Sequence, residues 1–301
     1  MFDALQNVAR SRNVQLLLYD PCWFFQVIKI AARPTVQNTP GPRQFAIAES
    51  FVRAKHLEAA KAGERTDSAG KAIRNKILLC VPDAEYRRIR QQLEFVDLPN
   101  HLSLHEPHKK QQFVYFLNRG LASIVVAMRR GRDVEAGVVG YEGAVGVAVV
   151  VGLDRSPLRV IMQIQGGGFR ISAHALCAAL GATPDLQMRL NRYAVLQGMQ
   201  VAQTAACNRL HDIKPRLARW LLMAQDRVQT ASLPITHDFL AIMLGTDRPS
   251  VTLALGALQK DHAIQCRRGA VQILNHRKRL EASVCECYRV IEQLNGRLGL
   301  K

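Results

Sequence analysis

The segment 235–264 contains two apolar patterns with helical spacing that meet at Gly245, ITHDFLAIMLGTDRPSVTLALGALQKDHAI. Apolar residues form one helical stripe in each half: Phe239, Leu240, Met243 and Leu244 in the first, and Val251, Leu255 and Leu258 in the second. Thr236 and Asp247 stand where N-caps belong, and a glycine can end the first helix in the left-handed conformation. The pattern predicts two short helices joined by a tight turn.

The second helix carries polar side chains that a buried helix would not need, and two such helices form a helix-turn-helix. In that motif the second helix enters the DNA major groove, where arginine can contact guanine, serine or threonine a base or phosphate, and leucine a thymine methyl. AIQCRRGAVQIL then predicts a strand, a turn at 267–269 and a second strand, a wing whose arginines would lie near phosphates. The predicted DNA-binding residues are Thr236, Arg248, Pro249, Ser250, Thr252, Leu253, Arg267 and Arg268.

Upstream, residues 76–180 alternate short β-rich runs with glycines, after a helical start in NKILLCVPDAEYRRIRQQL. Runs of about 4 to 8 residues with glycine between them favour a compact antiparallel roll. Within this region QGGGFR, residues 165–170, lacks the Lys-Ser/Thr of a phosphate loop, so we predict a hairpin turn there.

Residues 181–210 predict one long helix, because about 25 positions after Pro184 contain no proline. Its apolar stripe is Leu186, Leu190, Tyr193, Leu196 and Met199. A helix of this length can pair with a copy of itself, although a core helix would show a similar pattern. Residues 1–75 have no sustained period, and we expect a mostly poorly ordered extension with one short helix near 49–62.

The predicted fold class is therefore α+β with four parts. They are an N-terminal extension (1–75), an antiparallel β-roll sensor domain (76–180), a dimerisation helix (181–210) and a winged helix-turn-helix DNA-binding domain (211–301).

Charge, hydropathy and cysteine content limit the classes of binding partner and the cellular compartment that we expect. Lys and Arg number 41 against 24 Asp and Glu, a net charge of +17 that favours nucleic acid or an acidic surface as partner. No apolar run is long enough to span a membrane, no secretory signal begins the chain, and the seven scattered cysteines are typical of a reducing compartment. We expect a cytoplasmic protein without a membrane partner.

Two short cysteine motifs are candidate chemical sites. Cys285 and Cys287 in CEC offer two potential ligands for half of a metal site, but no second ligand pair stands nearby in the sequence. Cys207 and His211 can touch as i and i+4 residues of a helix, but no third group is present to orient a catalytic pair. We therefore predict neither a metal site nor an enzyme.

The C-terminal third resembles the Crp/Fnr family of bacterial transcription regulators. The resemblance is carried by QTAACNRLHDIKPRLARWLLMAQDRV, by 233–274 and by LEASVCECY, while VYFLNRGLASIVVAMRRGRDVEAGVVGYEGAVG is similar to a cyclic-nucleotide-binding-like roll. It covers about residues 75–290. It implies a homodimer through the long helix, a sensor roll, double-stranded DNA as ligand, and RNA polymerase as a further partner.

The resemblance also bears on the effector. Family members that bind cyclic nucleotides use a glutamate for the ribose hydroxyl and an Arg-Ser or Arg-Thr pair about ten residues later for the phosphate. Here Arg155 and Ser156 match the second element, but Val145 stands in place of the glutamate. A valine leaves the hydroxyl unpaired, at a cost of about 1 to 3 kcal/mol. We expect no standard cyclic nucleotide and no cofactor. The alternative function is a small-molecule sensor or adaptor that holds an acidic protein instead of DNA.

Overall fold

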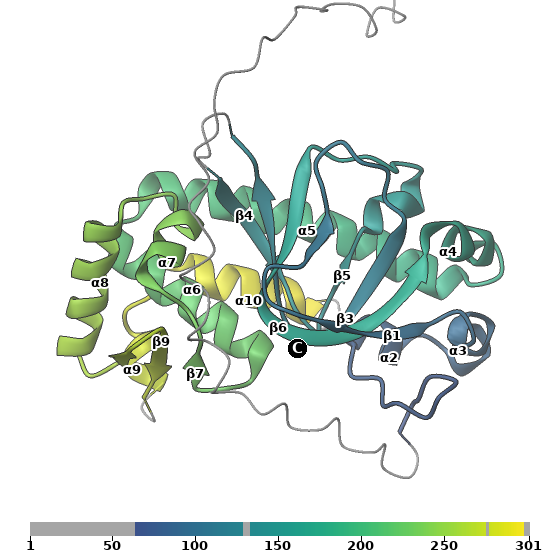
Figure 1. Ribbon diagram of the computed structural model, residues 1–301, viewed down its shortest axis with the longest axis horizontal. Coiled ribbons are helices and arrows are strands. Elements are labelled where there is room, and N and C mark those ends of the chain that lie inside the picture. The colour runs from purple at the N-terminus through teal and green to yellow at the C-terminus, as the bar shows by residue number, and fades with distance from the viewer. Residues whose placement is uncertain (1–63, 129–132, 275–276, 298–301) are drawn as a thin grey trace, which may run out of the picture. The chain divides into compact units, whose positions relative to one another are not determined.

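The computed structural model describes residues 64–128, 133–274 and 277–297, which fall within one compact unit, residues 55–301 (Figure 1). The helix expected near 49–62 and the rest of the extension up to residue 63 lie outside the described residues. Residues 64–75 were expected in the extension, but Ala72 and Ile73 are buried in the fold. Asn75 explains this ordering, because its amide donates to the carbonyl oxygens of Leu117 at 2.9 Å and Gly143 at 2.7 Å.

The roll begins with helices α2 (Lys76–Cys80) and α3 (Asp83–Arg90) and consists of antiparallel strands. Strands β1 (Glu94–Leu98), β6 (Leu158–Ser172), β3 (Phe113–Val126) and β4 (Val134–Val139) are neighbours in that order. The short strands β2 (Ser103–His105) and β5 (Ala144–Val145) pair with β6 and β3, and a 3-10 helix, η2 (Val147–Val151), follows β5. The class predicted from sequence, an antiparallel roll followed by helices, is confirmed.

Strands β3 and β6 are 14 and 15 residues long, well above the predicted length. The predicted hairpin turn at 165–170 was wrong, because Gly166–Gly168 lie inside β6 and pair with β1 and β3. A Cβ atom on Gly166 would lie 2.0 Å from the carbonyl oxygen of Arg119, and one on Gly168 would lie 2.4 Å from that of Phe116. These glycines permit a close approach of two long strands rather than a reversal of the chain.

Helices α4 (Ala173–Leu180) and α5 (Pro184–Leu210) follow the roll, and α5 packs one face against it. Leu186, Leu190, Tyr193 and Leu196 are buried in the same apolar cluster as Phe116 and Phe169 of the sheet. Met199, the fifth member of the predicted stripe, is instead 50% exposed. The buried face continues through Gln200, Thr204 and Cys207. Because Gln200 and Thr204 are polar, a prediction based on apolar residues alone selected Met199 instead of Gln200.

The C-terminal part contains α6 (Ile213–Val228), α7 (His237–Met243), α8 (Arg248–Lys260), α9 (Arg277–Glu281) and α10 (Cys287–Arg297). A small sheet of β7 (Ser232–Leu233), β9 (Ala270–Ile273) and β8 (Ile264–Arg267) lies beside them. Its apolar cluster includes Leu121, Val138 and Ile164 from the roll, so the roll and the helices share one core. Trp220 of α6 donates a 2.7 Å hydrogen bond to Glu135 of β4 across this shared core.

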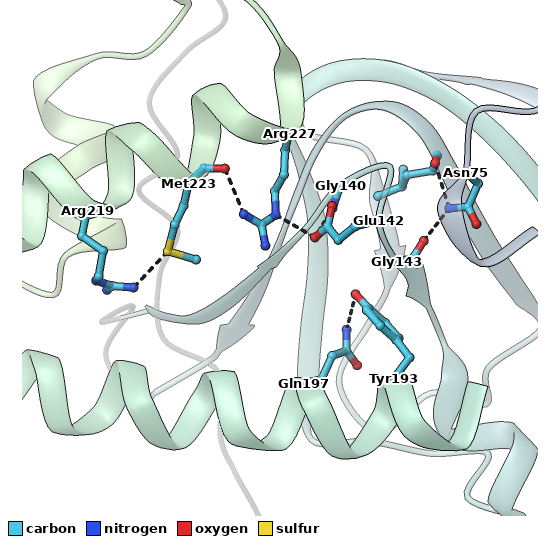
Figure 2. Close-up of polar contacts among 10 residues, drawn as sticks. Asn75, Gly140, Glu142, Gly143, Tyr193, Gln197, Arg219, Met223 and Arg227 are labelled. Carbon is cyan, nitrogen blue, oxygen red and sulfur yellow. Dashed lines mark hydrogen bonds and ion pairs between the residues drawn. The ribbon is translucent and has the colours of Figure 1, made fainter. Parts of the chain in front are cut away.

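Figure 2 shows the polar contacts at this junction. The Arg227 guanidinium points from α6 to the Glu142 carboxylate, and Tyr193 of α5 lies beside Gly143. Side chains at the two neighbouring glycines would not fit: a Cβ on Gly140 would lie 2.6 Å from the Arg227 side chain, and one on Gly143 would lie 1.8 Å from the Tyr193 hydroxyl. The two glycines of GYEG thus allow this turn of the roll to pack closely against α5 and α6.

Candidate nucleic-acid interface

The predicted helix-turn-helix is present as α7 and α8, which lie beside one another in Figure 1. The Thr236 hydroxyl accepts a hydrogen bond from Phe239 N at 3.2 Å, and the Asp247 carboxylate accepts one from Ser250 N at 2.8 Å, so both residues are N-caps. Gly245 has a φ of 59° after the end of α7, as expected for a left-handed helix terminus. Local sequence signals therefore determine both helix starts and the turn.

Helix α8 separates a buried face from an exposed one. Val251, Leu255 and Leu258 are buried as predicted. The opposite face is open and consists of Arg248, Pro249, Thr252, Leu253, Gly256, Gln259 and Lys260. Leu253 is 76% exposed, and apart from adjacent residues and the α8 backbone no described heavy atom lies within 4 Å of a Cβ built on Gly256. We call this surface the recognition face; it contains four of the residues predicted to contact DNA.

Several polar groups near the start of α8 are held by partners within the protein. The Arg248 Nε atom lies 3.3 Å from Asp238 Oδ1, and both side chains are exposed. The Thr252 hydroxyl donates to the backbone carbonyl of Arg248 at 3.0 Å and lies 3.0 Å from His237 Nδ1. Sequence reasoning did not include His237 and Asp238, because only the fold of the turn brings the start of α7 against α8.

Ser250 and Thr236 also have internal roles. The Ser250 hydroxyl donates to Asp247 Oδ2 at 2.9 Å, and hydrogen bonds from Ser250 lower the pKa of Asp247. Because Thr236 and Ser250 both take part in N-cap hydrogen bonds, their hydroxyls are less free to contact DNA than the side chains of Arg248 and Leu253.

The wing also forms as predicted. Strands β8 and β9 pair from Ile264 with Ile273 to Arg267 with Ala270, and Arg268 and Gly269 make the turn. Gly269 has a φ of 71°, a left-handed conformation that glycine adopts readily at the second central position of a turn. Arg267 and Arg268 are exposed at this tip, where a positive charge can approach a phosphate backbone.

Residues 215–282 match the family model for the Crp-like helix-turn-helix domain. This part of the chain is therefore a Crp-like helix-turn-helix domain. The resemblance stated from sequence is confirmed over these residues by the family model, and in the overall fold by the similar structures below. No helix among the described residues is both long and apolar enough to cross a membrane.

Several solved structures share the fold at low sequence identity. A Crp/Fnr-family protein from Eubacterium rectale is 16% identical, with 69% of this chain and 95% of that chain covered and a TM-score of 0.54. FixK2 from Bradyrhizobium japonicum is 13% identical, with coverage of 64% and 98% and a TM-score of 0.55. CLP from Xanthomonas campestris, described as a c-di-GMP responsive global regulator, is 18% identical, with coverage of 64% and 100% and a TM-score of 0.53. None of the curated proteins compared with the chain matched it.

Arg155 and Ser156 line a cavity of about 100 Å³ inside the roll. Val145, which is 2% exposed, lines the same cavity. The valine therefore shares this cavity with Arg155 and Ser156, the pair that matches the phosphate-binding residues of the family. The Arg155 guanidinium donates to the His108 carbonyl at 2.9 Å, and the Ser156 hydroxyl accepts from Leu158 N at 3.1 Å.

Other polar side chains at this cavity were missed by the sequence analysis. Gln111 lines it from the roll and Gln197 from α5, so the long helix forms part of the wall. Burial lowers the pKa of His105, whose buried Nε2 atom has no hydrogen-bond partner among the described residues. No spacing rule in the sequence connects these positions, because they come together only through the roll and the docking of α5.

The two cysteine motifs considered separately from sequence meet in space. Cys207 and His211 at the end of α5 lie against Cys285 and Cys287 at the start of α10, and the four potential ligand atoms lie within 4.8 Å of one another. The sequence analysis found no partner pair for CEC because the two pairs are more than 70 positions apart.

Proposed function

We propose that the protein is a homodimeric, sequence-specific DNA-binding regulator whose roll responds to a small effector other than a standard cyclic nucleotide. The observation that supports DNA reading best is the recognition face, a helix surface that starts with Arg248 and consists of exposed residues. Arg248 would read a guanine edge, Leu253 would contact a thymine methyl, and Arg267 and Arg268 would contact phosphates. RNA polymerase is proposed as a further partner, by resemblance to the family.

The exposed face of α5 supports the dimer. Exposed positions recur at intervals of four and three residues: Met188, Arg192, Val195, Met199, Ala202, Ala206 and Arg209. This is the spacing of a coiled-coil seam, and Val195 and Met199 are 60% and 50% exposed. Burial of such apolar side chains against a second copy of α5 would stabilise a dimer, because each buried methylene contributes about 0.8 kcal/mol. In two-fold dimers of this kind, recognition helices read half-sites about 34 to 36 Å apart.

The roll cavity supports a small effector. Its volume of about 100 Å³ is below the roughly 300 Å³ at which pockets begin to hold drug-sized molecules. Val145 offers no acceptor for a ribose hydroxyl, and the CLP response to c-di-GMP involves a ligand that is larger still. Gln197 lies on α5 and lines the cavity. An effector bound there would therefore contact the proposed dimer helix directly.

Selection of DNA sites from a random pool tests the proposal, with the wild type, Arg248→Ala and Arg268→Ala compared. We expect a palindrome from the wild type and loss of preference at one position per half-site with Arg248→Ala, at a cost of about 1 to 3 kcal/mol. The Arg268→Ala control should weaken all sequences alike and lower the slope of log affinity against log salt by about one unit. Equal loss of specific and random DNA in both variants would contradict base reading by Arg248.

A flat salt dependence with no enriched sequence, with or without added ligands, would favour the adaptor function over DNA binding. Calorimetry with cAMP tests the effector. We expect no heat of binding for the wild type, whereas heat that disappears in Arg155→Ala would show that a cyclic nucleotide occupies the cavity.

A further inference from the structure

Four side chains from two distant parts of the chain form one compact cluster beside the junction of α5 and α6. Cys207 Sγ lies 3.5 Å from Cys285 Sγ, and Cys287 Sγ lies 3.7 Å from His211 Nδ1. The three cysteines are buried and His211 is half-buried. Buried thiols more than 70 positions apart need no such convergence for packing, whereas a shared ligand requires it.

We propose that Cys207, His211, Cys285 and Cys287 bind one structural zinc ion. Three cysteines and one histidine are a usual ligand set for structural zinc, with Zn–S bonds of about 2.3 Å and Zn–N bonds of about 2.0 Å in a tetrahedron. Those bond lengths place neighbouring ligand atoms about 3.5 to 3.8 Å apart. The Cys207–Cys285 and Cys287–His211 separations agree with this spacing, and all four ligand atoms lie within 4.8 Å of one another.

The hydrogen bonds around the cluster are those that metal ligands need. His211 Nε2 lies 3.3 Å from Glu286 Oε2, so the carboxylate can hold the Nε2 proton and leave Nδ1 free to bind the metal. Gln203 Nε2 donates to Cys287 Sγ at 3.0 Å, an interaction that stabilises a thiolate. Glu286 stands between two of the ligands in the sequence, so the CEC motif supplies both cysteines and the residue that orients the histidine.

The charge of the surroundings also fits a bound metal. One Zn²⁺ with three thiolates and a neutral imidazole carries a net charge of −1. Arg216 and Arg219 are 7% and 3% exposed, and both lie close enough to interact electrostatically with Cys207. The Nε atom of each has no hydrogen-bond partner in the described part of the chain. A net negative site would offset the cost of burying these cations.

Other uses of the cluster fit less well. A four-iron cluster binds each ligand to a different iron and would hold the sulfur atoms farther apart than they are here. A Cys207–Cys285 disulfide needs a bond of about 2.05 Å and would give no role to Cys287, His211 or Glu286. With four protein ligands the zinc ion has no open position, so the site is structural and not catalytic.

The position of the cluster indicates what the zinc would do. His211 is the C-cap of α5, immediately before α6, and α6 begins the DNA-binding domain. Helix α10 packs on both α5 and α6 (Figure 1). The ion would therefore fasten the C-terminal helix to the α5–α6 corner and hold the dimer helix and the DNA-binding domain in one arrangement. This proposal does not depend on what the recognition face binds.

Metal content of the reduced full-length protein is the first test. We expect one zinc per chain by plasma mass spectrometry in the wild type and in Cys177→Ser, a matched control because Cys177 is an exposed thiol on α4 outside the cluster. Cys287→Ser should retain well below one zinc. Equal zinc content in Cys287→Ser and Cys177→Ser, or a reduced folded wild type that binds no zinc, would overturn the proposal.

Cobalt substitution and Glu286→Gln keep the test independent of any folding defect in a cysteine variant. Co²⁺ added to the metal-free wild type should give thiolate charge-transfer bands and the intense visible bands of a tetrahedral site, and zinc should displace it. Glu286→Gln should weaken zinc binding about 10- to 100-fold without changing the stoichiometry. Weak octahedral cobalt bands, or a disulfide between Cys207 and Cys285 in protein kept under reductant, would contradict the proposal.

Discussion

Arg227 Nε of α6 lies 2.7 Å from Glu142 Oε1 in the turn between β4 and β5, and both side chains are buried (Figure 2). The pair connects the roll to the first helix of the DNA-binding domain. Arg227 also donates to the Met223 carbonyl at 3.0 Å, which holds the guanidinium along α6. A displacement of the β4–β5 turn would therefore move Arg227 and, with it, α6.

Glu142→Ala should lower the free energy of unfolding by about 3 to 5 kcal/mol, because it leaves the Arg227 charge buried without its partner. Urea unfolding followed by circular dichroism measures the change. The double variant Glu142→Met, Arg227→Met is the control, and it should lose less than Glu142→Ala because no uncompensated charge remains. Equal losses in the two variants would show that packing, not the ion pair, holds the junction.

Glu135 should make stability depend on pH. Burial raises the pKa of Glu135 to about 7 in the fold, against hydrogen bonds from Ser123 and Trp220 and the charges of Arg219 and Arg227, which lower it. An acid with a raised folded pKa contributes its full stability below the unfolded pKa of 4.5, and loses it as the pH rises to about 7. The loss should be at most about 3 kcal/mol.

Urea unfolding of the wild type and Glu135→Gln at pH 5 and pH 8 measures this effect. Glutamine keeps an uncharged side chain that can accept from Trp220, so the variant should lose less stability between the two pH values than the wild type. The same pH dependence in both proteins would show that Glu135 does not titrate in this range.

Val195→Glu with Met199→Glu should convert a dimer into a monomer, since charges placed in an apolar seam repel across the two-fold axis. Analytical ultracentrifugation should give twice the mass of one chain for the wild type and once for the variant. Ile242→Glu is a matched control, because Ile242 is an exposed apolar residue on α7, away from α5. Loss of the dimer in the control, or retention of it in the α5 variant, would contradict this interface.

Gly256→Ala should stabilise the protein and weaken DNA binding. The position is helical and open, so alanine should raise the free energy of unfolding by about 1 kcal/mol. On the recognition face the added methyl group would hinder close approach of the DNA, and we expect several-fold weaker binding in a fluorescence anisotropy titration. Unchanged DNA affinity in a stabilised variant would place Gly256 outside the interface.

The sequence by itself determined the parts of the molecule that depend on neighbouring residues. The caps at Thr236 and Asp247, the left-handed Gly245 and the turn of the wing were predicted because hydrogen bonds and backbone preferences act over a few positions. The same holds for the stripe from Leu186 to Leu196, which follows from helical periodicity. The resemblance carried by these segments predicted the helix-turn-helix domain that the family model matches over residues 215–282.

The tertiary structure decided what depends on segments far apart in the chain. Gly166–Gly168 have the local signal of a turn, but they lie within a strand because β1 and β3 approach too closely for side chains there. Burial of Ala72 and Ile73 follows from Asn75 and its long-range hydrogen bonds. Cys207 and His211 meet Cys285 and Cys287 only because α10 folds back onto the α5–α6 corner. No local periodicity records such contacts, since the energy that forms them comes from packing and bonds between distant residues.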